Sequence, residues 1–100
     1  MKIISFNING LRARLHQLQA LIDAHSPDVI GLQEIKVDNA QFPVSDVEAM
    51  GYHVVYHGQK AHYGVAMLTK VVPTNVQYGL PTDTEEHQKR LIAVTLPTAN

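Results

Sequence analysis

The sequence predicts an α/β fold in which one mixed β-sheet carries helices on one of its faces. Residues 1–32 follow the order strand, helix, strand, which permits two parallel strands joined by a crossover. Two further apolar segments, at 52–57 and 63–70, are separated by a short polar stretch, as in a hairpin. With 45% hydrophobic and 17% charged residues, the chain of 100 residues has the composition of one globular domain or part of one.

The first strand is expected at 3–8, where every second side chain is apolar and would point to one side of a sheet. Asn9 and Gly10 interrupt this pattern, and Asn9 is suited to cap a following helix. A helix is expected at 11–25, because leucines recur there at helical spacing, and Pro27 lies just beyond its end.

The second strand is expected at 29–32, which is nearly all apolar, as in the centre of a sheet covered on both faces. A crossover of this kind is almost always right-handed and joins parallel strands. Parallel pairing brings the carboxyl ends of both strands to one edge of the sheet, so Asn7 and Glu34 would be neighbours. This proximity is the main structural prediction from the pattern alone.

The middle of the chain predicts a short helix and a hairpin. Residues 45–48 have the pattern of a capping box, and Gly51 would end the helix that it starts. The strands at 52–57 and 63–70 would flank a polar, cationic tip at 58–62.

Two more strands are expected at 75–80 and 90–96, on either side of an acidic loop at 81–88. Several of the expected strands are apolar on both faces, whereas the expected helices can cover only one face of the sheet. A further layer is therefore expected to cover the second face.

Composition excludes several kinds of site. The chain has no cysteine, which excludes disulfides, zinc–thiolate sites and cysteine nucleophiles. The formal net charge is −1, so a surface for a polyanion would have to be local. The apolar stretch at the start of the chain is interrupted by polar residues too early for a signal peptide, and no apolar run reaches membrane-spanning length. We expect a cytoplasmic protein with no membrane partner.

The most informative stretch is 28–36, Asp-Val-Ile-Gly-Leu-Gln-Glu-Ile-Lys, in which an apolar strand pattern runs directly into Glu34. A carboxylate at the edge of a core needs a partner. The residues alone leave three partners open: water, a cation such as Lys36 or Arg12, or a hard divalent ion. Mg²⁺ suits such a site, because it binds oxygen ligands and often uses one or two carboxylates beside a substrate phosphate.

The residues around the first turn offer further contacts. The amide of Asn7 could orient Glu34, a metal-bound water or a phosphate oxygen, and it could equally be a plain strand terminator. Gly10, Arg12 and Ala13 open the expected helix, where free backbone N–H groups favour an anion such as phosphate.

The hairpin tip and the last strand hold the remaining candidates. His62, beside Lys60, is a candidate for a phosphate contact, whereas the spacing of the other histidines does not suggest a shared metal. Arg90 would either pair with Glu85 or Glu86 or face a backbone phosphate.

Three segments then carry a resemblance to a known family. They are 5–13 (Ser-Phe-Asn-Ile-Asn-Gly-Leu-Arg-Ala), 27–36 (Pro-Asp-Val-Ile-Gly-Leu-Gln-Glu-Ile-Lys) and 62–68 (His-Tyr-Gly-Val-Ala-Met-Leu). In this order and spacing they resemble the N-terminal part of exonuclease III-like members of the endonuclease/exonuclease/phosphatase family, which includes abasic-site endonucleases and DNase I. The visible departure is Ile35, where the family usually has Thr.

The resemblance implies a four-layered α/β sandwich of the DNase I-like type, in which two mixed sheets pack face to face with helices outside. Residues 1–100 would be the N-terminal portion of a single domain, holding only the first mixed sheet with its helices. The implied activity is Mg²⁺- or Mn²⁺-dependent hydrolysis of phosphodiesters in duplex DNA. It would combine 3′–5′ exodeoxyribonuclease, abasic-site endonuclease and 3′-phosphatase reactions, acting at 3′ ends and abasic sites.

The resemblance also assigns roles to residues. Glu34 is the implied metal ligand, with Asn7 beside it, and these two are the catalytic candidates of this chain. The candidate DNA-binding residues are Asn9, Gly10, Arg12, Ala13, Lys36, Lys60, His62, Tyr63 and Arg90. The family's catalytic Tyr, its Asp-x-Asn pair, a further Asp and its terminal Asp-His would lie beyond residue 100.

The parent protein is therefore expected to be an active, monomeric DNA-repair nuclease. The 100 residues alone are expected to be inactive and to self-associate through an exposed sheet face. Two alternatives remain open: a non-catalytic module that binds nucleic acid or a protein partner, and another phosphatase of the same family.

Overall fold

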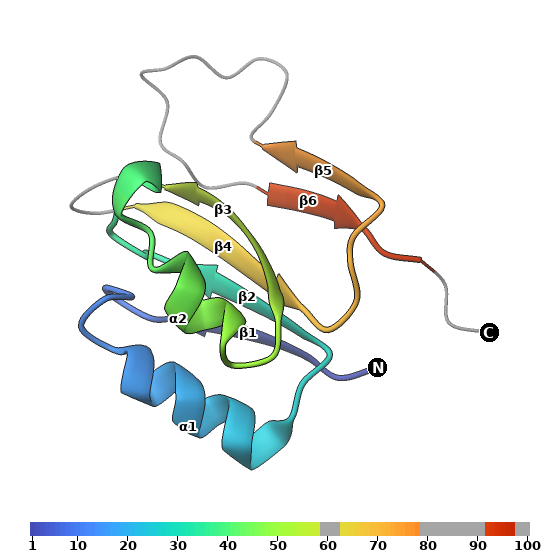
Figure 1. Cartoon of the computed structure of the whole chain (residues 1–100), viewed down its shortest axis with the longest axis horizontal. Helices are drawn as coiled ribbons and strands as arrows, with labels where there is room; N and C mark the ends of the chain where they lie inside the picture. Colours follow the sequence, from blue (N-terminus) through green and yellow to red (C-terminus); the bar gives the residue numbers. More distant parts are fainter. Residues whose placement is uncertain (59–62, 79–91, 98–100) are drawn as a thin grey trace.

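The computed structural model describes residues 1–58, 63–78 and 92–97, and its centre is a four-stranded mixed sheet (Figure 1). The strands follow the order β1-β2-β4-β3 across this sheet. They are β1 (Ile3–Asn7), β2 (Val29–Gln33), β3 (His53–Gly58) and β4 (Gly64–Thr69). The predicted mixed α/β arrangement is confirmed.

β1 and β2 pair in parallel, as predicted. Their register aligns Ile3 with Val29 and Asn7 with Gln33. The chain passes between them through α1 (Leu15–His25), and β4 then pairs antiparallel with both β2 and β3. Because Gln33 is the neighbour of Asn7, the next residue along the chain lies at the same edge of the sheet.

The first helix begins at Leu15 rather than at residue 11, so Asn9 is not its N-cap. The cap position is held by Arg14, and no side chain caps the helix. The reason is a tertiary contact. Leu11 is fully buried, and its N–H donates to the carbonyl of Ile35 at 2.9 Å. This bond holds Leu11 at the start of a turn over residues 11–13, so the helix begins only at Leu15.

The second helix is short and does not use the predicted capping box. It is α2 (Val44–Glu48), preceded by the 3₁₀ turn η1 (Asn39–Gln41). Ser45 lies inside α2, and the cap position is Pro43, so the chain enters the helix earlier than the capping pattern predicts. Gly51 follows the helix with a φ of +96°, a conformation that favours glycine.

Both helices lie on the same face of the sheet, and the core lies between them and the strands (Figure 1). Val54 and Tyr56 of β3 pack against this core, and the ring of Tyr56 stacks on Phe42 with 4.0 Å between centroids. The buried cluster consists of Ile8, Leu11, Leu18, Ile22, Ile30, Leu32, Ile35, Val37, Phe42, Val47, Tyr52, Ala66 and Leu68.

The opposite face of the sheet is only partly covered. Val55 and Met67 are half-buried there, and Ile3 at the free edge is 67% exposed. The expectation that the helices cover one face only is thus confirmed.

A second sheet of two antiparallel strands approaches this partly covered face, so the chain holds more than the first mixed sheet that was expected for residues 1–100. It consists of β5 (Asn75–Tyr78) and β6 (Ile92–Thr95), and β6 contacts β3 and β4. Tyr78 of β5 stacks with His57 of β3 at 5.8 Å between ring centroids. His57 alternates with the core-facing Tyr56, so this contact lies on the face away from the helices.

The predicted strands at 75–80 and 90–96 correspond to β5 and β6 as far as the described residues extend. The predicted acidic loop at 81–88 and tip residues 59–62 lie outside the described residues. Within 1–58, 63–78 and 92–97, no helix is both long and apolar enough to cross a membrane.

Polar contacts around Asp28 hold the amino ends of β1 and β2 together. Asp28 Oδ2 accepts a hydrogen bond from the N–H of Lys2 at 2.7 Å, and the Asp28 carbonyl accepts from the N–H of Lys70 at 3.1 Å. The hydrogen bond from the Lys2 N–H lowers the pKa of the Asp28 carboxyl below its ordinary value of 3.8. Burial of the carboxyl raises the pKa, but by less. The positive charges of Lys70, the N-terminus and Lys2 act in the same direction as the hydrogen bond.

Asp28→Asn is expected to destabilise the protein at neutral pH and to have little effect in strong acid. The folded-state pKa of Asp28 lies below 3.8, so the carboxylate contributes stability above that unfolded-state value. This contribution is lost as the pH falls through the folded-state pKa. Urea unfolding of both proteins at the two pH values measures it, and an equal difference at both would contradict the prediction.

Candidate functional site

Asn7 and Glu34 meet at the carboxyl edge of the main sheet. Asn7 is the last residue of β1, and Glu34 directly follows β2. The amide Nδ2 of Asn7 donates a hydrogen bond to Glu34 Oε2 at 2.5 Å. A hydrogen bond to a carboxylate is strong and directional, so it fixes the orientation of the acid. The predicted proximity of an amide and an acid at one sheet edge is confirmed.

Asn9 and Lys36 extend this pair into a polar cluster. The N–H of Asn9 donates to Asn7 Oδ1 at 3.1 Å, and Lys36 Nζ donates to Asn9 Oδ1 at 2.5 Å. Lys36 Nζ also forms a long ion pair with Glu34 Oε1, at 3.9 Å. We refer to Asn7, Asn9, Glu34 and Lys36 as the edge cluster.

The backbone of the edge cluster is strained. Asn9, Glu34 and Lys36 have φ values of +49°, +52° and +57°, in the left-handed region. Such residues cost about 1–3 kcal/mol each and persist where the surrounding structure holds them, often at functional sites. Here the N–H of Gly10 donates to the carbonyl of Glu34, and the N–H of Lys36 donates to the carbonyl of Tyr63, both at 2.9 Å.

The donor atoms of the edge cluster fit a hard divalent cation. The side chain of Glu34 is 42% exposed, Oε2 is held by Asn7, and Oε1 lies 3.9 Å from Lys36 Nζ, beyond hydrogen-bond distance. Oδ1 of Asn7 keeps a second lone pair beyond the one that Asn9 uses. Among the described residues, no group of three or more His, Cys, Asp or Glu is placed to hold a metal. The site therefore offers one carboxylate with an amide beside it, which suits Mg²⁺ when water and phosphate complete the ligand set.

Gly10, Arg12 and Ala13 lie in the turn before α1 and not at the start of the helix, contrary to the prediction. Gly10 has a φ of +101°, and an added Cβ would lie 3.2 Å from Arg14 Nη1. Arg12 does not reach Glu34, because its Nη1 donates to Gln41 Oε1 at 2.9 Å. Arg12 and Ala13 are exposed, and their role in DNA binding stays a prediction.

The other candidate DNA-binding residues also stay predictions. Tyr63 is half-buried, and its carbonyl contacts Lys36 of the edge cluster. Lys60, His62 and Arg90 lie outside the described residues.

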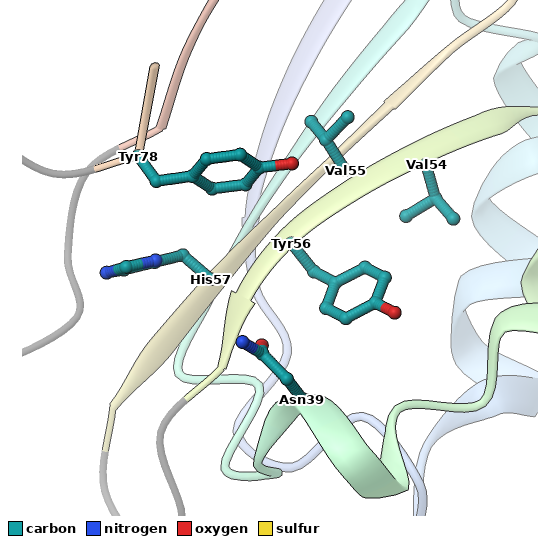
Figure 2. A pocket seen from close by; sticks show the side chains of 6 residues that line it. All are labelled: Asn39, Val54, Val55, Tyr56, His57 and Tyr78. Atoms are coloured by element: carbon teal, nitrogen blue, oxygen red, sulfur yellow. The ribbon is translucent and has the colours of Figure 1, made fainter. Parts of the chain in front are cut away.

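A separate pocket of about 490 Å³ lies at the outer edge of the main sheet (Figure 2). Figure 2 shows the ring of Tyr78 on one side of β3 and the ring of Tyr56 on the other. The pocket contains no residue of the edge cluster, so it is distinct from the predicted metal site. Its lining residues are Asn39, Val54, Val55, Tyr56, His57 and Tyr78.

An anchor between η1 and the end of β3 was not predicted from the sequence. Asn39 Oδ1 accepts a hydrogen bond from the N–H of Gly58 at 2.7 Å. A Cβ added at Gly58 would lie only 2.5 Å from the carbonyl oxygen of Val37. The backbone at 37–39 thus packs directly against the end of β3. In the sequence, only the glycine at the end of this strand pattern could have indicated the contact, since a strand glycine can mark a close backbone approach.

A sequence model of the Endonuclease/Exonuclease/phosphatase family matches residues 4–98 of this chain. The chain is similar to exodeoxyribonuclease III of Haemophilus influenzae, with 61% identity over 98 residues, covering 98% of the chain and 37% of the relative. It is 34% identical over 98 residues to an exodeoxyribonuclease of Bacillus subtilis, covering 94% of the chain and 38% of that protein. The chain therefore spans well under half the length of these relatives.

Solved structures resemble the chain over the same region. A 3′ phosphatase from Neisseria bound to a product DNA hairpin matches with a TM-score of 0.87 and 42% identity, covering 96% of this chain and 37% of that one. An AP endonuclease from Archaeoglobus fulgidus matches with a TM-score of 0.88 and 38% identity, with the same coverage of 96% and 37%. The mixed sheet and its helices have the DNase I-like fold of these proteins over the shared region.

Gly58→Ala is expected to lower the free energy of unfolding by about 1–3 kcal/mol, because the new methyl group would overlap the backbone at 37–39. Gly31→Ala is the matched control. It is also a strand glycine, but its added Cβ would meet its nearest neighbours at 3.8 and 4.0 Å, which is ordinary contact. Urea unfolding compares the two variants, and equal stability would contradict the assigned close approach.

Proposed function

The chain belongs to the endonuclease/exonuclease/phosphatase family, and we propose that it is the N-terminal portion of a metal-dependent nuclease that hydrolyses duplex DNA. The observation that carries this proposal is the hydrogen bond between Asn7 and Glu34 at the shared carboxyl edge of β1 and β2. The chain corresponds to 37% of the exodeoxyribonuclease III relative. We therefore expect the rest of the active site from the remainder of a single DNase I-like domain.

The names of the matching proteins support a set of related reactions. They include an exodeoxyribonuclease, an AP endonuclease and a 3′ phosphatase bound to DNA. We infer the same reactions here: removal of nucleotides from 3′ ends, incision at abasic sites and removal of 3′ phosphates. All three hydrolyse a phosphate ester, so one site can serve them. By analogy with the bacterial relatives, we place the protein in the cytoplasm with its DNA substrate.

Glu34 is the residue that would hold the divalent ion, and Asn7 would orient it and offer its amide oxygen. The family generally depends on divalent metal ions. We propose Mg²⁺ or Mn²⁺ for this site, because its donors are oxygen atoms. When bound, such an ion supplies a Lewis acid to the scissile phosphate.

The residues around the edge cluster would hold the DNA strand. Arg12 and Ala13 are exposed in the turn that begins at Gly10, and Lys36 presents its ammonium beside Glu34. Contacts of this kind go to phosphates, so they position a strand without selecting its sequence. We propose that the same surface also includes Asn9, Lys60, His62, Tyr63 and Arg90.

Glu34→Gln is expected to slow metal-dependent cleavage of abasic duplex DNA by the parent protein about 100- to 1,000-fold, because electrostatic stabilisation at the phosphate is lost. Glu48→Gln is the matched control, since it makes the same change at an exposed position of α2.

The 100 residues alone are expected to cleave no DNA, because the edge cluster holds a single acid and no second group that could activate water.

Gel assays of cleavage and binding separate the alternatives. Salt-dependent DNA binding that is insensitive to Mg²⁺ and to Glu34→Gln would favour a non-catalytic nucleic-acid-binding module. Hydrolysis of phosphate monoesters without any DNA cleavage would favour another phosphatase of the family. Cleavage by the 100 residues alone that depends on metal and Glu34 would contradict their expected inactivity.

The 100 residues alone are expected to self-associate, because the face of the main sheet away from the helices is only partly covered. In the parent protein, a second full sheet would cover this face, and a monomer is expected. Ile3→Lys should weaken association, since Ile3 is 67% exposed at the sheet edge, whereas Val71→Lys changes a residue of the loop after β4. Light scattering that finds a monodisperse monomer of the unmodified chain would contradict this prediction.

A further inference from the structure

We propose that Asn9 is a positioning residue that holds the ammonium of Lys36 away from Glu34 and thereby keeps the carboxylate available for a divalent cation. This inference rests on the proposed metal-binding role of Glu34. It gives Asn9 a task other than the helix capping and DNA contact that the sequence suggested.

The two contacts of Lys36 differ in length. Its Nζ lies 2.5 Å from Asn9 Oδ1 but 3.9 Å from Glu34 Oε1. A direct hydrogen bond between an ammonium and a carboxylate is typically about 2.7–2.9 Å long. The ammonium therefore stops about 1 Å short of contact with the acid, and the amide of Asn9 accepts the hydrogen bond instead.

Asn9 is itself held in place by its neighbours. Its N–H donates to Asn7 Oδ1 at 3.1 Å, and its carbonyl accepts a hydrogen bond from the guanidinium of Arg14. Asn7 in turn binds Oε2 of Glu34. Asn7 thus holds Oε2 of the carboxylate, and Asn9 holds the Lys36 ammonium that faces Oε1.

Oε1 of Glu34 is the atom for which Lys36 and a divalent cation compete. The side chains of Lys36 and Glu34 are 29% and 42% exposed, so both can adjust their positions in solvent. Without the Asn9 amide, the ammonium could close onto Oε1 and occupy the oxygen that the metal needs. Because Asn9 is neutral, it holds Lys36 without adding a negative charge, and Lys36 keeps its positive potential for a nearby phosphate.

Binding of Mn²⁺ in the absence of DNA, measured by electron paramagnetic resonance, tests this proposal in the parent protein. Asn9→Gly keeps a backbone that tolerates positive φ but removes the amide, and it is expected to weaken Mn²⁺ binding about three- to fivefold. Adding Lys36→Met to Asn9→Gly is expected to restore the wild-type affinity or exceed it. Asn9→Asp still accepts from the ammonium, so it should retain binding.

Lys70→Met is the matched control, because Lys70 lies beside the amino ends of β1 and β2, at the other end of the strands, where its Nζ donates to Ser26. It should leave the affinity for Mn²⁺ unchanged. If the double variant binds as weakly as Asn9→Gly, the loss does not come from Lys36 and the proposal is overturned. Lys36→Met alone should change the affinity much less than it does in the Asn9→Gly background, because Asn9 already holds the ammonium away from Oε1. If Asn9→Gly does not fold, Asn9→Ala with and without Lys36→Met makes the same comparison. An equal gain from Lys36→Met with and without Asn9 would show that Lys36 weakens binding by its charge alone, and would also overturn the proposal.

Glu34→Gln separates this inference from the proposed function. If Mn²⁺ binding does not depend on Glu34, the proposed metal role fails and this inference fails with it. If Glu34→Gln abolishes binding while Asn9→Gly leaves it unchanged, the metal role stands and only the role of Asn9 is refuted.

Discussion

The parallel pairing of β1 and β2 is the constraint on which the whole site depends. In a parallel pair, both carboxyl ends emerge at the same edge, so residues far apart in the chain become neighbours. Asn7 and Glu34, which are 27 positions apart, meet in this way. The pairing requires the crossover through α1, and α1 stays on the sheet because Leu18 and Ile22 are buried against it. An apolar core on one face therefore sets the geometry of a polar cluster at the edge.

The same core holds the strained backbone of the edge cluster. Ile35 lies between Glu34 and Lys36, both of which have left-handed φ angles, and its own side chain is 0% exposed. Burial of a side chain of this size contributes about 1.5–3 kcal/mol, which is comparable to the cost of one left-handed residue. The carbonyl of Ile35 also accepts from Leu11, which is equally buried. Packing next to the cluster thus offsets part of the strain within it.

Sequence patterns predicted the strands and the meeting of Asn7 and Glu34, because alternation and strand order are properties of the chain itself. They misplaced the start of α1, since the deciding contact of Leu11 is with a distant segment. They also missed the left-handed residues and the close approach at Gly58, which only the packed structure determines. The contact between Lys36 and Asn9 could not be predicted for the same reason.

Asn9 is followed by Gly10, and asparagine before glycine is the dipeptide most prone to spontaneous deamidation, in which the glycine nitrogen attacks the side-chain amide to form a succinimide. In this fold, that nitrogen already donates to the carbonyl of Glu34 at 2.9 Å, and the amide oxygen accepts from Lys36. The hydrogen bond to Glu34 therefore also restrains the nucleophile of this ageing reaction. The chemical durability of the turn and the geometry beside Glu34 thus depend on the same backbone hydrogen bond.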